Sequence, residues 1–145
     1  MGCRVTMSLV SERQDGPIGD DWKYEIEAKV FNEGLKGKGQ ISVPKHTLSS
    51  GVTQEPHGAP EPVTMEAGEC GGKVLLRVLV KATEVDTFIS DKGQTSLDIP
   101  LNCPGPGETE LTKETEISVG VRESPGISGE TSIFRVVLRF TAQCA

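Results

Sequence analysis

Residues 73–83, KVLLRVLVKAT, form the most apolar stretch of the chain. The even-numbered positions within it are all apolar, namely Val74, Leu76, Val78, Val80 and Ala82. Leu75 and Leu79 add apolar cover to the opposite face. A strand projects successive side chains to opposite sides, and a strand covered on both sides lies inside a sheet. We therefore predict that residues 73–83 form a central strand.

The same alternation of apolar and polar residues recurs through most of the chain. The segments that follow it are 3–9, 22–30, 41–43, 63–65, 97–103, 117–121 and 134–144. Pro60 and Pro62 precede the short segment 63–65, and proline restricts a strand to a sheet edge. The large aromatic residues on the inward register are Trp22, Tyr24, Phe134 and Phe140. Since helical spacing does not outscore the alternation over ten residues together, we predict seven to nine strands and little helix.

Strands with one polar face each bury their apolar faces best when two sheets pack together. We predict an antiparallel β-sandwich, immunoglobulin-like or C2-like, that forms a single domain over residues 1–145, with a closed barrel as the second possibility. Residues that tolerate positive φ predict turns at 32–34, 91–93 and 124–129.

Composition disfavours two classes of protein, those that bind nucleic acids and those that span a membrane with helices. The formal net charge of −6 repels phosphate backbones, so a nucleic-acid partner is not expected. No apolar run approaches the roughly 18 residues that a membrane-spanning helix needs, and no cationic, apolar leader opens the sequence. We expect a soluble domain.

Two segments carry recognisable motifs: YEIEAKVFNEG at 24–34 is an alternating strand that ends in Asn-x-Gly, and VTMEAGECGGKVLLRVLVKA at 63–82 contains an Ala-Gly-Glu followed by a long apolar strand. Together they resemble bacterial extracellular immunoglobulin-like modules of the CARDB type. The resemblance implies a β-sandwich in an adhesive or spacer setting, without catalysis.

The four cysteines lie close to the ends of predicted strands and mostly on inward registers: Cys3, Cys70, Cys103 and Cys144. No two of them form a C-x-x-C pair, which disfavours zinc. An even number of inward cysteines suits two disulfides in an exported domain, and we expect Cys3 with Cys144 and Cys70 with Cys103. The alternative is four buried free thiols in a cytosolic protein.

The first six residues, MGCRVT, fit a pattern for N-terminal acylation, with Cys3 placed for a second acyl chain or as a lipoprotein cysteine. The alternation already starts at Cys3, so we favour a first strand over an anchor. Because two disulfides suit an exported domain, we expect an extracellular, periplasmic or cell-surface protein. The alternative is a cytoplasmic protein or one acyl-anchored at the inner membrane face, and a membrane becomes a partner only with a lipidated N-terminus.

Carboxylates gather in the predicted loops. Asp15, Asp20 and Asp21 lie in the first, Asp86 and Asp91 in a second, and Glu123 and Glu130 in a third. If the first and third loops meet at one end of the sandwich, their oxygens suit calcium. The predicted ligands are Asp15, Asp20, Asp21, Glu123 and Glu130, and calcium is the one cofactor considered.

We predict that the protein is not an enzyme. His46 and His57 fall in the Pro/Gly-rich segment 44–62, where a histidine is usually a solvated turn residue, and no G-x-S-x-G or phosphate-binding glycine loop occurs. Segment 44–62 is expected to be a mobile or partner-contacting loop. Phe31 and Phe88 are the aromatic residues expected at the surface, too few for a carbohydrate platform.

These features predict a non-catalytic β-sandwich that binds other proteins or serves as a structural module outside the cytoplasm. It would contact a protein partner, or itself, through edge strands or loops, with Lys36, Lys38 and Lys45 protecting the third strand from uncontrolled pairing. The alternative is a calcium-dependent or membrane-surface-binding domain, C2-like, that uses its acidic loops.

Overall fold

The computed structural model describes residues 2–87, 89–123 and 129–145, and this part of the chain is all-β. Its eight strands are β1 (Gly2–Asp15), β2 (Asp21–Phe31), β3 (Leu35–Thr47), β4 (Val63–Glu69), β5 (Lys73–Glu84), β6 (Asp91–Asn102), β7 (Leu111–Arg122) and β8 (Thr131–Cys144). The prediction of an antiparallel, helix-poor β-sandwich is confirmed. No helix long and apolar enough to cross a membrane is present in these three ranges.

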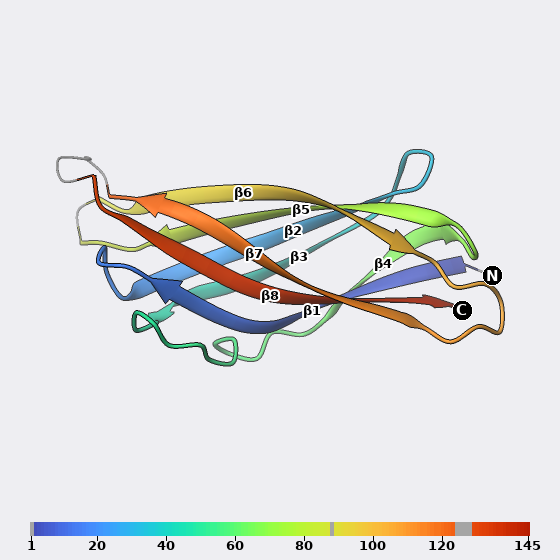
Figure 1. Ribbon diagram of the computed structural model, residues 1–145, viewed down its shortest axis with the longest axis horizontal. Helices are drawn as coiled ribbons and strands as arrows, with labels where there is room; N and C mark the ends of the chain where they lie inside the picture. Colours follow the sequence, from blue (N-terminus) through green and yellow to red (C-terminus); the bar gives the residue numbers. More distant parts are fainter. Residues whose placement is uncertain (1, 88, 124–128) are drawn as a thin grey trace.

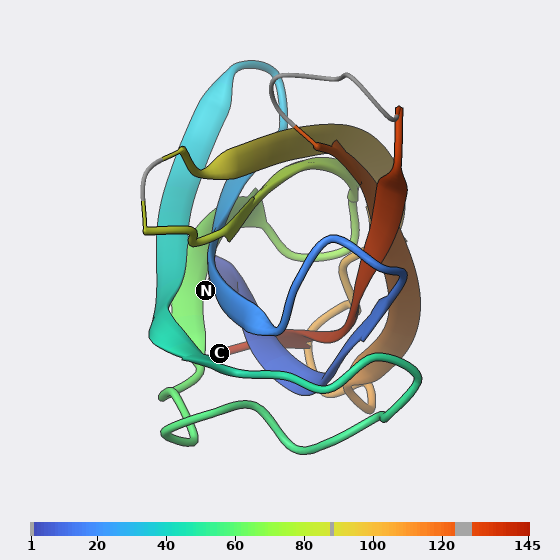
Figure 2. The same cartoon turned by 90° about the vertical axis from the view of Figure 1, so that its left-hand side faces the viewer.

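The strands form two antiparallel four-stranded sheets, in the orders β4-β1-β8-β7 and β3-β2-β5-β6. The two sheets wrap around a common core (Figures 1 and 2). β5 lies between β2 and β6, as its apolar residues on both faces predict. β4 is an edge strand, in agreement with the two prolines before it.

The core lies between the sheets and is built from the alternating apolar residues. Trp22 and Tyr24 of β2 contact Phe134 of β8 across the gap, with ring centroids 5.6 and 4.7 Å apart. Phe140 is also fully buried, so the predicted inward register of all four aromatic residues is confirmed. Phe31 is partly exposed and lies under the Arg77 guanidinium, whereas Phe88 lies outside the described residues.

Glycines let the edge strands of the two sheets approach each other closely. A Cβ atom on Gly37 of β3 would clash with the backbone oxygen of Glu66 in β4. A Cβ atom on Gly93 of β6 would clash in the same way with the backbone oxygen of Gly120 in β7. The edge strands of the two sheets therefore approach closely at these two glycines, which leaves less of the edges free to pair with other chains.

The connections gather at two opposite ends of the molecule (Figure 1). One end, here called the loop end, holds the β1–β2, β5–β6 and β7–β8 connections. There the first predicted loop contacts the start of β8, where the Ile18 backbone N–H donates to Ser132 Oγ at 3.2 Å. The turn at 32–34 is confirmed by positive φ at Glu33 and Gly34, but residues 91–93 already belong to β6, so the turn precedes them. Most of the predicted turn at 124–129 lies outside the described residues.

Both termini and both disulfides lie at the opposite end. The structure pairs Cys3 with Cys103 and Cys70 with Cys144, so the presence of two disulfides is confirmed and the expected pairing is wrong. Cys3 faces Cys144 in the β1–β8 register, yet it bonds across the core to the residue that follows β6. The residue alternation predicted which way the cysteines point, but it holds no information about which sulfur atoms meet between sheets.

The N-terminus is held in the first strand, as we predicted. The backbone of Gly2 exchanges hydrogen bonds of 3.0 and 2.9 Å with Ala145 at the end of the chain. The sulfur of Cys3 is used by its disulfide, so in this structure it is not available to carry a lipid.

The disulfide pattern can be tested by mapping peptides from the unreduced protein. We expect cross-linked peptides that join Cys3 to Cys103 and Cys70 to Cys144. Replacing both cysteines of the first pair by serine (C3S/C103S) should lower the free energy of unfolding by about 4 kcal/mol, because that bond closes a loop of 100 residues in the unfolded chain. A peptide that joins Cys3 to Cys144 would contradict this arrangement.

The close approach of the edge strands predicts a sharp difference between two glycines. Gly37→Ala should lower the free energy of unfolding by about 1–3 kcal/mol, since β3 and β4 must separate to admit the methyl group. Gly120→Ala is the matched control, because a Cβ atom there meets nothing within 4 Å. Chemical denaturation measures both, and equal effects would show that the edges do not touch in this way.

Candidate functional site

The outward side of the sheet β3-β2-β5-β6 is rich in lysine, and we call it the basic face. Trp22, Tyr24 and the other even-numbered residues of β2 point into the core. The odd-numbered residues between them must therefore point out. The cations that this register places on the basic face are Lys23, Lys29, Lys36, Lys38, Lys73, Arg77, Lys81 and Lys92. Its carboxylates are fewer: Glu25, Glu27 and Asp98.

A hollow of about 680 Å³ lies on the basic face near the loop end. Lys23, Lys81 and Lys92 line it from three neighbouring strands, together with Pro44 and Thr83. The hollow therefore combines cationic side chains with apolar and hydroxyl-bearing surface, and Glu25 adds one carboxylate to its lining.

Most lysines of the basic face form no ion pair with the residues that the structure describes. Lys81 is the exception, with its Nζ 3.8 Å from Glu25 and 4.0 Å from Glu27. Four of the five arginines that the register places on the outer side of the other sheet reach a carboxylate, and they are Arg4, Arg13, Arg135 and Arg139. Of the outer faces of the two sheets, the basic face therefore has more positive charge that no ion pair neutralises.

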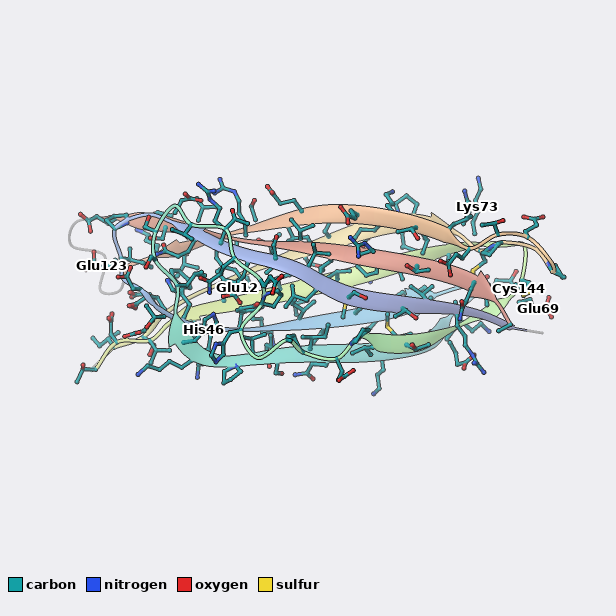
Figure 3. All side chains as sticks on the ribbon, turned by 90° about the horizontal axis from the view of Figure 1, so that it is seen from below. Glu12, His46, Glu69, Lys73, Glu123 and Cys144 are labelled. Carbon is teal, nitrogen blue, oxygen red and sulfur yellow. A yellow bond between two sulfur atoms is a disulfide. The ribbon has the colours of Figure 1, made fainter. Side chains whose placement is uncertain are left out.

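A buried carboxylate, Glu12, organises the segment after β3 (Figure 3). Its Oε1 accepts hydrogen bonds from the Tyr24 hydroxyl at 2.7 Å and the His57 backbone N–H at 3.1 Å. Its Oε2 accepts from His46 Nε2 at 2.5 Å and Gln54 Nε2 at 2.8 Å. Four donors compensate the burial of this charge.

The Glu12 contacts overturn the expectation of a solvated turn histidine for His46, whereas His57 is exposed as expected. His46 is buried in β3, its Nδ1 donates to the Pro44 carbonyl at 2.8 Å, and its ring stacks on that of the exposed His57 at 4.5 Å. Burial raises the pKa of the Tyr24 phenol far above its usual range, and the hydrogen bond to Glu12 raises it further, so the phenol remains a donor. The network fastens residues 46–57 to β1.

The sequence pattern missed Glu12 because of a β-bulge. The β1–β8 register shifts between Leu9 and Ser11, which turns the even-numbered Glu12 and Gln14 inward after the odd-numbered Cys3–Leu9 run. A one-residue shift of this kind moves every later side chain to the other face. Nothing in the local sequence announces it.

Carboxylates do converge at the loop end, but not those that we expected. Glu84, Asp86 and Asp91 place one carboxylate oxygen each within 4.8 Å of one another, and we call them the acidic cluster. Glu84 ends β5 and faces Asp91 at the start of β6, and both point into the end of the core. Glu84 continues the inward even register that begins at Val74, a signal that the sequence contained.

The acidic cluster is electrostatically strained. Burial raises the pKa of the Glu84 carboxyl to about 7. Neighbouring negative charges add to the rise, first that of Asp86 and then those of Asp91 and Asp21. A group that carries positive charge would relieve this repulsion.

The five expected calcium ligands do not come together in the described part of the chain, where the acidic cluster is the group that does. Asp15 already pairs with Arg13 and Arg135, which hold the pKa of its carboxyl below the usual range. Asp20 is exposed, and Asp21 at the start of β2 affects the acidic cluster only as a neighbour. Glu123 and Glu130 pair through their backbones across the β7–β8 connection. The expected ligand set and calcium binding itself both stay predictions.

The Glu12 network predicts a strong effect of a nearly isosteric change. Glu12→Gln places an NH₂ group against two donors, so the free energy of unfolding should fall by about 2–3 kcal/mol. Amide hydrogen exchange should accelerate over residues 46–57. The control Glu25→Gln, on the basic face, should change the stability by less than about 0.5 kcal/mol. Unchanged exchange in Glu12→Gln would contradict the anchoring role.

Comparison with known proteins adds no family to this description: no family model and no curated protein matches the chain.

Proposed function

We propose that the protein is a non-catalytic, disulfide-bonded binding or structural module that contacts an acidic protein through its basic face. The observation that carries this proposal is the group of lysines around the hollow, of which Lys23 and Lys92 lack an ion pair among the described residues. Two disulfides are typical of an oxidising environment, which favours a site of action outside the cytoplasm.

An acidic protein surface suits the basic face better than a nucleic acid does. The whole chain carries a net charge of −6, which opposes approach to a long polyanion, whereas a local positive patch steers a protein of complementary charge. Pro44 and the aliphatic stems of the lysines offer the apolar contact that protein interfaces need at their centre.

In this proposal the acidic protein binds the basic face and not an edge strand. β3 packs closely along β4, and β6 along β7, so the strand edges that we first considered are partly covered. The outward side of β3-β2-β5-β6 is the broader accessible surface of that sheet, and the hollow lies on it.

The contacts of His46 support a non-catalytic role. Both ring nitrogens of His46 are engaged, one by the Pro44 carbonyl and one by Glu12, so neither is available to take a proton from a substrate. All four cysteines are used in disulfides and therefore offer no thiolate nucleophile.

The proposal is tested with a fluorescent poly-glutamate peptide as an acidic probe. The wild-type protein should bind it in a salt-dependent way, and Lys23→Glu with Lys92→Glu (K23E/K92E) should weaken binding at least about tenfold, or ~1.4 kcal/mol. Fluorescence anisotropy at low and physiological salt measures both.

The matched control, Arg4→Glu with Arg139→Glu, makes the same change in net charge on the other sheet and should bind like the wild type. Equal losses in both variants would show that net charge alone is responsible and would contradict a specific face. Binding to phosphatidylserine vesicles without binding to the peptide would favour the alternative, a membrane-surface domain.

A further inference from the structure

The acidic cluster contains a buried oxygen that no hydrogen-bond donor satisfies. Glu84 is 2% exposed, and its Oε2 has no hydrogen-bond partner within the described ranges. Leaving a buried carboxylate oxygen without a donor is costly, and Glu12 shows that this protein elsewhere supplies donors to a buried carboxylate. For Oε2 of Glu84 no such donor occurs among the described residues, and the carboxylates of Asp86 and Asp91 lie close to Glu84 instead.

The spacing of the acidic cluster fits one cation. Oxygens bind calcium at about 2.3–2.6 Å, so two ligands of the same ion are at most roughly 5 Å apart. The three carboxylate oxygens of the cluster all lie within 4.8 Å of one another. Asp86 lies in an exposed connection, which leaves room for water or backbone oxygens to complete the shell.

Two described neighbours of Glu84 bring no compensating positive charge to it. Asp21 contributes a further negative charge, and Gly19 packs so tightly on Glu84 that a Cβ atom there would clash with its Oε1. A small divalent ion would compensate the negative charge at this position.

We propose that Glu84, Asp86 and Asp91 bind a calcium ion at the loop end. The ion would bridge the end of β5, the β5–β6 connection and the start of β6. It would thereby fix the strand ends whose outward residues, Thr83 and Lys92, line the hollow on the other side of the sheet.

Thermal unfolding of the full-length protein, freed of metal with EDTA, tests the site. At about 10 mM calcium we expect the midpoint to rise by about 5 °C, with a smaller rise for magnesium, which requires a tighter octahedral shell. No rise with calcium would overturn the proposal.

Two variants separate binding from folding. Glu84→Gln should abolish the calcium-dependent rise while its midpoint in EDTA equals or exceeds that of the wild type, because one of the repelling charges is gone. Asp86→Asn, at an exposed position, should reduce the rise without affecting the fold. Asp20→Asn is the matched control: it removes an exposed carboxylate from the same end and should retain the full rise. A full rise in Glu84→Gln would place any bound calcium elsewhere.

The single tryptophan offers a direct probe of occupancy. Trp22 faces Glu84 in the β2–β5 register, so terbium in the proposed site should show luminescence on excitation of the indole. Calcium should reverse the signal, Glu84→Gln should lose it and Asp20→Asn should keep it; a signal that survives in Glu84→Gln would overturn the assignment. K23E/K92E leaves the acidic cluster intact and should respond normally, so failure of the calcium site and failure of the basic face are distinguishable.

Discussion

The stacking of Trp22 on Phe134 joins the two sheets near the loop end of the core, and it depends on every second side chain of β2 and β8 pointing inward. Burial of these alternating apolar residues is the main stabilising contribution of the fold. It also determines the chemistry of the surface. The lysines that alternate with the core residues of β2, β3 and β5 must point to the outside. The same alternation of side chains therefore produces both the core and the basic face.

Two buried glutamates show how differently the fold treats the same side chain. Glu12 is surrounded by a phenol, an imidazole, an amide and a backbone N–H, and its charge helps to hold a long connection against β1. Glu84 is surrounded by other carboxylates, and its Oε2 has no donor in the described part of the chain. The first arrangement is complete as it stands, whereas the second gains stability only by taking up a proton or a cation.

The two ends of the sandwich have different roles in this structure. At the terminal end, the disulfides join the first and last strands to the connections after β6 and β4, and the backbones of Gly2 and Ala145 close the sheet. The loop end has no such covalent bond among the described residues and concentrates negative charge instead. Because the terminal end is fixed by disulfides, ion binding at the loop end would alter the module only in the region around the hollow.

The sequence by itself determined the strand pattern, because a period of two is a local property of the backbone. It placed the central strand at 73–83, the edge strand after Pro60 and Pro62, and the aromatic core. Only the tertiary structure decided the cysteine pairing, the inward turn of Glu12 after the bulge, and the choice of Glu84, Asp86 and Asp91 as the converging carboxylates. Each of these depends on distances between segments that are remote in the chain. The alternation of residues shows to which side of a strand a side chain points, but not how far apart two such segments lie.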